Sequence, residues 1–100
     1  MNMQQMLIQA QKIQRDLKKA LDELGKKEFV ISKGGLVTVT VLGNKTVKSV
    51  NIDKDAFDEE NKEMVEESIC LAISEAIEKI EKETEEINER ITGRPGGMLG

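Results

Sequence analysis

Residues 34–53 read GGLVTVTVLGNKTVKSVNID, and this segment decides the fold. Its first half alternates valine with threonine at the two-residue period of a half-buried strand, with valines at Val37, Val39 and Val41. Gly34-Gly35 precedes the run and Gly43-Asn44 follows it, as in the turns of β-hairpins. The segment therefore predicts antiparallel sheet, with strands at about 36–42 and 46–52.

The flanking residues add a third strand and one irregularity. Residues 26–32 read KKEFVIS and place Phe29 and Ile31 on one face, which predicts a strand at about 27–32. In the last strand Val50 and Ile52 share a face but Val47 does not, so we expect a bulge or a loose start there.

The segment before the sheet predicts a helix at about 2–25. Its apolar residues alternate in spacing between three and four, an a/d seam over three heptads, at Met3, Met6, Ala10, Ile13, Leu17, Ala20 and Leu24. Gly25 is expected to end this helix. Leaving a Leu or Ile of the seam in water forgoes roughly 1.5–3 kcal/mol, so we expect the whole seam to be packed.

The segment after the sheet predicts a second helix at about 59–91, with Asp58 as its N-cap. One apolar stripe runs along it, with Thr84 at a stripe position, through Val65, Ile69, Ala72, Ile73, Ala76, Ile77, Ile80, Ile87 and Ile91. Such a helix is roughly 50 Å long, more than a three-stranded sheet covers, so its far end should project. Gly93 should end it, and residues 93–100 are expected to form a flexible, Gly-rich tail.

These elements make one α+β domain at residues 1–92, with a helix, a three-stranded antiparallel sheet and a long helix. A chain of 100 residues with so small a sheet has little interior to fill, which favours burial against a partner.

Composition argues against catalysis, metal binding and membrane insertion. The chain has no His, and its single Cys70 lies in the apolar run at 69–73, where we expect a buried structural side chain. No zinc cluster, phosphate loop or catalytic constellation can be assembled, and the acidic run that starts at Asp58 lacks calcium-loop spacing. No run approaches the roughly 20 apolar residues of a membrane span. We expect an intracellular protein of the cytoplasm that needs no cofactor and no small-molecule substrate.

Charge is unevenly distributed along the chain. The formal net charge is −4, but residues 1–27 carry +3 and residues 56–92 carry −9. On the first helix Lys12, Arg15, Lys19 and Lys26 lie opposite Leu17, which indicates an outward basic stripe suited to phosphate. The alternative is an ordinary solvated face, since Lys12–Asp16, Lys18–Asp22 and Lys19–Glu23 have the four-residue spacing of helical ion pairs.

Several motifs together resemble one family. These are QAQKIQ at residues 9–14, GGLVTVTVLGN, VNID at residues 50–53, and the acidic start and Ile/Ala-rich body of the last helix. From about Met3 to Ile91 the chain resembles the YbaB/EbfC family of small bacterial nucleoid-associated proteins. The resemblance implies a tweezer-like homodimer with projecting helices, which binds double-stranded DNA and influences nucleoid organisation and gene expression.

In that family DNA binding is attributed to the projecting helices. The corresponding basic positions here are Lys12, Arg15, Lys18 and Lys19, together with Arg90 and Arg94 near the end of the last helix. The chain departs from many members because it starts directly in the helix and ends in GRPGGMLG. The resulting hypothesis is a non-enzymatic, nucleoid-associated DNA-binding homodimer. Its rival is a coiled-coil-like protein-interaction module with no direct DNA binding.

Overall fold

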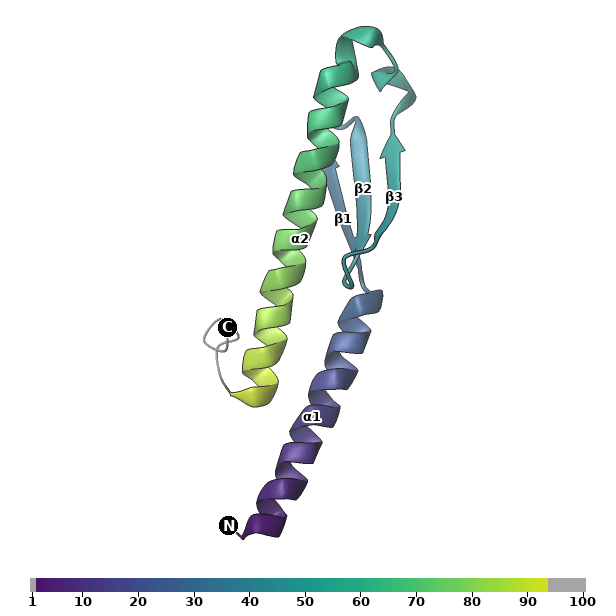
Figure 1. The fold of residues 1–100 in the computed structure, drawn as a ribbon. Coiled ribbons are helices and arrows are strands. Elements are labelled where there is room, and N and C mark those ends of the chain that lie inside the picture. The colour runs from purple at the N-terminus through teal and green to yellow at the C-terminus, as the bar shows by residue number, and fades with distance from the viewer. Residues whose placement is uncertain (1, 94–100) are drawn as a thin grey trace.

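The structure is a computed structural model, which describes residues 2–93. It contains a first helix, three strands, two short 3-10 turns and a second helix: α1 (Met3–Lys26), β1 (Glu28–Lys33), β2 (Val37–Leu42), β3 (Val47–Ile52), η1 (Lys54–Ala56), η2 (Glu59–Asn61) and α2 (Lys62–Thr92) (Figure 1). The predicted order of helix, antiparallel strands and helix is confirmed. The molecule is a rod of 69 × 22 × 15 Å, and its radius of gyration of 19.0 Å exceeds the ~13 Å of a compact chain of this length.

The sheet has the strand order β1-β2-β3, and both neighbouring pairs are antiparallel. Gly34 and Gly35 both have positive φ, 62° and 71°, and the Leu36 amide donates to the Lys33 carbonyl at 3.3 Å. Two left-handed residues in succession give the twist that a tight hairpin requires, and glycine adopts them without steric cost. The predicted turn between the first two strands is confirmed.

The expected irregularity in the third strand is a bulge at Lys48. Thr40 pairs with Ser49, but the next residue, Val41, pairs with Val47, so Lys48 has no partner of its own across β2. The extra residue returns Val47 to the face that carries Val50. The bulge thus aligns all the apolar residues of β3 with the buried valines of β2.

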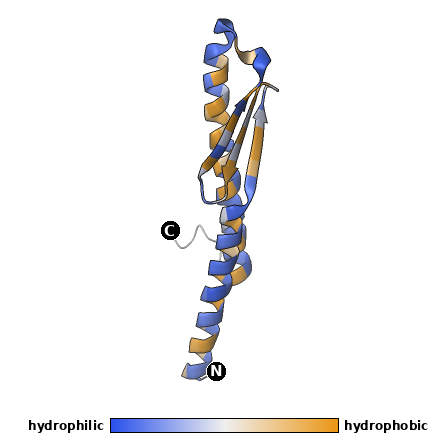
Figure 2. Ribbon diagram, turned by 90° about the vertical axis from the view of Figure 1, so that its right-hand side faces the viewer, coloured by the Kyte–Doolittle hydropathy of each residue, from blue (hydrophilic) through white to orange (hydrophobic). Residues whose placement is uncertain are grey.

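Helix α2 covers one face of the sheet, mainly over β1 and β2. The small side chains of Ala72 and Ala76 let α2 approach the sheet closely. The core consists of these alanines with Ile80 and Ile87 of α2, packed on Phe29, Ile31, Val37, Val39 and Val41 of the sheet. β3 lies outside this cover, so Val47 and Val50, on its inner face, remain 43% and 42% exposed. Figure 2 shows hydrophobic residues along the strands and at intervals along the helices.

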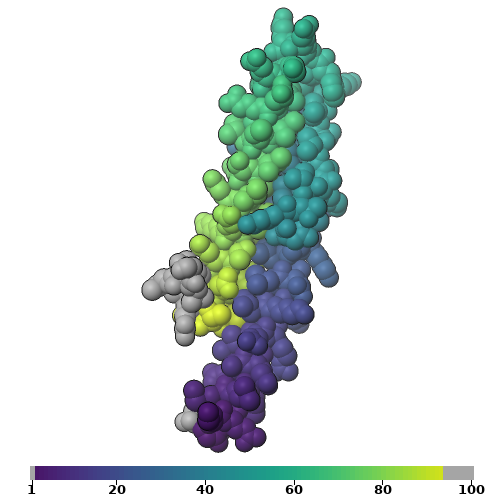
Figure 3. Space-filling model, viewed as in Figure 1, coloured from purple at the N-terminus to yellow at the C-terminus, as the bar shows by residue number. Residues whose placement is uncertain are grey.

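Helix α1 packs on the C-terminal part of α2 through Leu17, Ala20, Leu21 and Leu24. Its N-terminal half extends past the end of α2 (Figures 1 and 3). Met3 and Met6 are consequently 86% and 57% exposed. A single chain leaves the start of the seam uncovered, because α2 ends before it can cover the first turns, so the packing of the whole seam stays a prediction that needs a partner. The projecting element is the start of α1, while the far end of α2 leaves the sheet but lies beside α1.

Helix ends follow the predictions with two corrections. Gly25 does not end α1, which continues to Lys26 because Gly25 keeps a helical backbone and Lys27 takes the extended conformation. Asp58 caps the 3-10 turn η2 through the Glu60 amide at 3.2 Å, so α2 itself begins three residues later than expected. Gly93 does end α2, with φ of 73° and a hydrogen bond to the Glu89 carbonyl.

Cys70 is exposed, contrary to the expectation of a buried thiol. The covered face of α2 is centred near its alanines, and Cys70 lies roughly 160° around the helix from Ala72. Between residues 2 and 93 no helix is long and apolar enough to cross a membrane. In the same span no three acidic, Cys or His side chains are grouped to hold a metal ion.

Candidate nucleic-acid interface

The outer side of α1 carries a basic face, which we define as Lys12, Arg15, Lys18, Lys19 and Lys26. All of these side chains are exposed. The helical period directs them away from the side that packs on α2. Shallow hollows on this surface are lined by Arg15, Lys18 and Lys19, and one of them also by Asp22 and Glu23. The structure thus places four of the predicted DNA-binding residues on one exposed surface.

Within residues 2–93 the cations of the basic face have no carboxylate within 4.0 Å. The pairs named for the alternative of a solvated face, Lys12–Asp16, Lys18–Asp22 and Lys19–Glu23, do not lie within 4.0 Å in the described part of the chain, so that pairing does not form. Such pairs stabilise an exposed helix by only a few tenths of a kcal/mol, which does not fix two flexible side chains. The ion pairs that residues 2–93 do form are Lys27–Glu83, Lys33–Glu75, Lys45–Glu81, Lys48–Glu28 and Lys62–Glu66.

Arg90 lies apart from the basic face. It is exposed in the last turn of α2 and lines a groove between the two helices with Glu23, Glu83 and Glu86. These carboxylates lower the local positive potential, so Arg90 is less suited to phosphate than the residues of α1. Arg94 lies outside the described residues.

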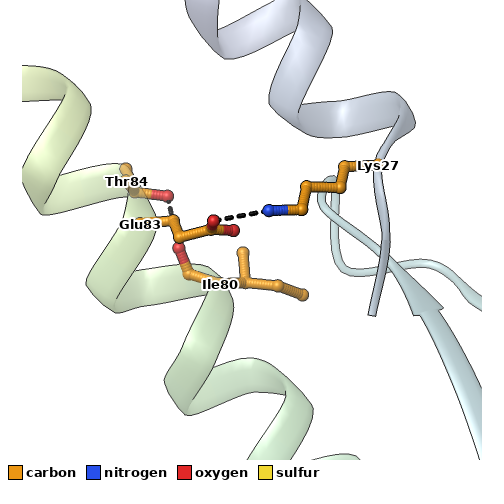
Figure 4. Close-up of polar contacts among 4 residues, drawn as sticks. All are labelled: Lys27, Ile80, Glu83 and Thr84. Carbon is orange, nitrogen blue, oxygen red and sulfur yellow. Dashed lines mark hydrogen bonds and ion pairs between the residues drawn. The ribbon is translucent and has the colours of Figure 1, made fainter. Parts of the chain in front are cut away.

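An ion pair at the junction of α1 and β1 holds α1 against α2 (Figure 4). Lys27 Nζ lies 2.6 Å from Glu83 Oε1 and 5.2 Å from the centre of the Phe29 ring. The other carboxylate oxygen, Glu83 Oε2, is buried and has no hydrogen-bond partner among the described residues. Lys27 and Glu83 are 56 residues apart, so no local sequence pattern could reveal the pair.

The β2–β3 turn supports the same junction. A Cβ placed on Gly43 would lie 1.7 Å from the Leu24 carbonyl oxygen, so only glycine lets the turn fit against the end of α1. The Gly43 amide also donates to the Lys27 carbonyl at 2.9 Å. Steric fit, this hydrogen bond and the Lys27–Glu83 pair together set the direction in which α1 projects.

The basic face occupies only the outer side of α1, since the part of α2 that packs on α1 carries carboxylates such as Glu83 and Glu86. The basic face lies on α1, whereas the acidic residues around η1, η2 and the start of α2 lie at the opposite end of the molecule, at Asp53, Asp55, Asp58, Glu59, Glu60, Glu63, Glu66 and Glu67 (Figure 1). A row of unpaired cations attracts a polyanion, and the acidic end repels it. The arrangement is thus suited to binding a phosphate backbone along α1.

Comparison with known proteins agrees with this chemistry. The curated relatives include nucleoid-associated proteins of Enterococcus faecalis (40% identical; 95% of this chain and 93% of the relative), Clostridium botulinum (41%; 98% and 88%) and Mycoplasmopsis pulmonis (39%; 99% and 95%). The crystal structure of the uncharacterized protein HP0035 from Helicobacter pylori has the same fold, with a TM-score of 0.74 and 18% identity over 100% of this chain and 99% of that one. The model of the YbaB/EbfC DNA-binding family matches residues 1–95. The chain therefore belongs to the YbaB/EbfC DNA-binding family.

Proposed function

We propose that this protein is nucleoid-associated and binds double-stranded DNA as a homodimer, through contacts of the basic face to backbone phosphates. The observation that carries the proposal is the row of exposed, unpaired cations on a projecting helix in a chain of a DNA-binding family. The nucleoid assignment rests on the names of its relatives. No catalytic step is part of this function.

The chemistry of the basic face favours phosphate over base contacts. Lysine and arginine side chains neutralise phosphates whatever the sequence, so we expect weak base selectivity. We assign the principal contacts to Lys12, Arg15, Lys18 and Lys19. Arg90 and Arg94 are assigned supplementary contacts, since Arg90 faces a groove that also holds carboxylates.

An uncovered apolar surface beside β3 supports the homodimer. We define the β3 strip as Val47, Val50, Ile52, Phe57 and Val65, of which Ile52, Phe57 and Val65 line one hollow. Phe57 is 74% exposed, and an apolar surface that remains open in one chain is typical of an interface. A second copy offers the same strip, so a two-fold axis would let each cover the other.

A two-fold dimer also suits duplex DNA. It presents two equivalent basic faces, and a separation of roughly 34–36 Å between them would match successive turns of the double helix. Engaging both faces makes the second contact intramolecular, which raises the affinity beyond that of one helix.

A charge-reversal pair tests the proposal. Arg15→Glu with Lys19→Glu places four negative charges on the two basic faces of a dimer, and we expect DNA retention in a band shift to fall more than about tenfold. The matched control is Lys54→Glu with Lys79→Glu, which makes the same charge change outside the basic face and should reduce retention far less. If both variants reduce DNA retention equally, the proposal is contradicted. If the Arg15/Lys19 variant retains DNA as the wild type does, the basic face is only solvated surface, and the protein-interaction module is favoured.

A further inference from the structure

The first turns of α1 differ from the rest of the helix in charge. Residues 2–11 contain no acidic or basic side chain, and every cation of the basic face lies C-terminal to them. This segment projects past the end of α2 (Figure 1), and the first α1 residue packed against the core is Leu17. The start of α1 is therefore a lone, uncharged stretch of helix that leads into the basic face.

Three exposed side chains of this segment continue the outer side of α1. Gln4, Ile8 and Gln11, which we define as the tip row, precede Arg15 and Lys18 with alternating spacings of four and three residues. Such spacing keeps successive side chains on one face of an α-helix. Gln11 also lines a shallow hollow with Arg15 and Lys18, so the tip row adjoins the basic face.

Contacts within the chain do not account for the tip row. Ile8 is 57% exposed and lies roughly 180° around the helix from Leu17 of the seam. A partner that covered the seam would therefore leave Ile8 in water. The side-chain amides of Gln4 and Gln11 make no hydrogen bond within residues 2–93, whereas that of Gln5 belongs to the helix cap. The apolar side chain and the two amides are thus available to whatever the basic face binds.

Base edges in the major groove of DNA match both kinds of side chain. A single helix, about 10–12 Å across, fits this groove, which is about 12 Å wide. Further along, α2 lies beside α1, so only the start of α1 is free to enter. The amide of glutamine pairs with N6 and N7 of adenine, and apolar side chains contact the C5-methyl group of thymine. All three residues of the tip row therefore suit A·T base pairs.

We infer that the tip row reads base edges in the major groove and gives the protein a preference for A·T base pairs. The inference rests on the proposed function, because it assumes that duplex DNA lies along the basic face. The cations of that face hold phosphates of any sequence and position α1. Gln4 and Gln11 then hydrogen-bond to adenine, and Ile8 packs on a thymine methyl group.

Modified duplexes test these contacts in band shifts. We expect wild-type protein to bind an A·T duplex about tenfold more tightly than a G·C duplex of equal length, which is small beside the preference of sequence-specific proteins. Uracil in place of thymine removes the methyl group from the major groove and leaves the minor groove unchanged. This replacement should weaken wild-type binding about fourfold, whereas Ile8→Ala should bind both duplexes equally.

A glutamine substitution separates base reading from phosphate binding. Gln11→Ala should reduce the A·T preference about fivefold. It removes no charge, so the slope of log affinity against log salt should stay the same. Gln9→Ala is the matched control, because Gln9 is also exposed but lies roughly 160° around the helix from Gln11, and it should keep the full preference.

The outcomes distinguish this inference from the function on which it rests. Equal binding of the A·T and G·C duplexes by the wild type, with the Arg15/Lys19 reversal defective, would overturn the role of the tip row alone. An A·T preference that Ile8→Ala and Gln11→Ala both keep would come from DNA shape and would overturn that role as well. Wild-type protein that binds neither duplex would overturn the proposed function itself.

Discussion

Gly43→Ala perturbs the contact that sets the direction of α1. The added Cβ would lie 1.7 Å from the Leu24 carbonyl oxygen and 2.6 Å from the Leu24 carbonyl carbon. Real Cβ contacts are not closer than 3.0 Å, so the turn and the helix end must separate by about 1.3 Å. Backbone atoms form both sides of this contact, and no rotamer change relieves the clash.

The separation has two energetic consequences. Leu24 is only 6% exposed, and overpacking at such a site costs about 1–3 kcal/mol. The hydrogen bond from the Gly43 amide to the Lys27 carbonyl would lengthen as well, with a loss of about 1 kcal/mol. We therefore expect Gly43→Ala to lower the free energy of unfolding by about 2–4 kcal/mol, a large part of a small domain's stability.

The control lies on the other side of the same contact. A Cβ on Gly25 meets Asn44 Cβ at 3.6 Å, an ordinary distance, and Gly25 lies in a helix. Gly25→Ala should therefore stabilise the protein by about 0.5–1 kcal/mol. Urea unfolding followed by helical circular dichroism measures both, at one protein concentration because a dimer's stability depends on it. A Gly43→Ala variant within about 0.5 kcal/mol of wild type, or two variants that destabilise equally, would refute the reasoning.

Three further substitutions, two of them with a matched control, test the packing and the proposed dimer. Lys27→Met should lower the free energy of unfolding by about 1 kcal/mol, because it leaves the partly buried Glu83 unpaired. Lys62→Met breaks the Lys62–Glu66 pair, whose side chains are 77% and 63% exposed, and should cost about 0.3 kcal/mol or less in the same urea assay. Ile80→Ala should cost about 3 kcal/mol, since Ile80 is 1% exposed at the centre of the core, and a loss below 1 kcal/mol would contradict that placement. Val50→Glu should convert the proposed dimer to monomer in sedimentation equilibrium, while Val30→Glu, on the opposite face of the sheet, should leave that dimer intact.

Local sequence patterns predicted the sheet well because strand signals are short-range. The alternation of Val37, Val39 and Val41 identified the buried face, and Gly34-Gly35 identified the turn. Even the bulge at Lys48 could be predicted, since Val47 was out of phase with the apolar residues that follow it. Each of these features depends on residues within a few positions of one another.

Features that depend on where one element ends beside another could not be predicted. The seam of α1 is periodic throughout, but only Leu17 to Leu24 meet α2, because α2 ends beside the middle of α1. Cys70 lies in an apolar run, but its exposure depends on which side of α2 faces the sheet. Gly43 was identified as a turn residue, whereas its necessity comes from Leu24, which is distant in the chain.

The candidate site could be predicted in its residues but not in its electrostatics. The basic stripe of α1 followed from helical spacing, and its exposure agrees with that prediction. The helical ion pairs expected to neutralise it do not form, while lysines elsewhere pair with distant carboxylates, as Lys27 does with Glu83. Sequence spacing reports which charges can meet, but the fold decides which ones do.

The salt dependence of duplex binding tests the phosphate-contact mechanism. With four contacts from each of two basic faces, log affinity should fall with log salt at a slope near −7, roughly an upper bound because the acidic end opposes binding. Band-shift titrations of wild-type protein over a range of salt concentrations give this slope. A steep decline is the expected result, and DNA retention that does not change with ionic strength would contradict the mechanism.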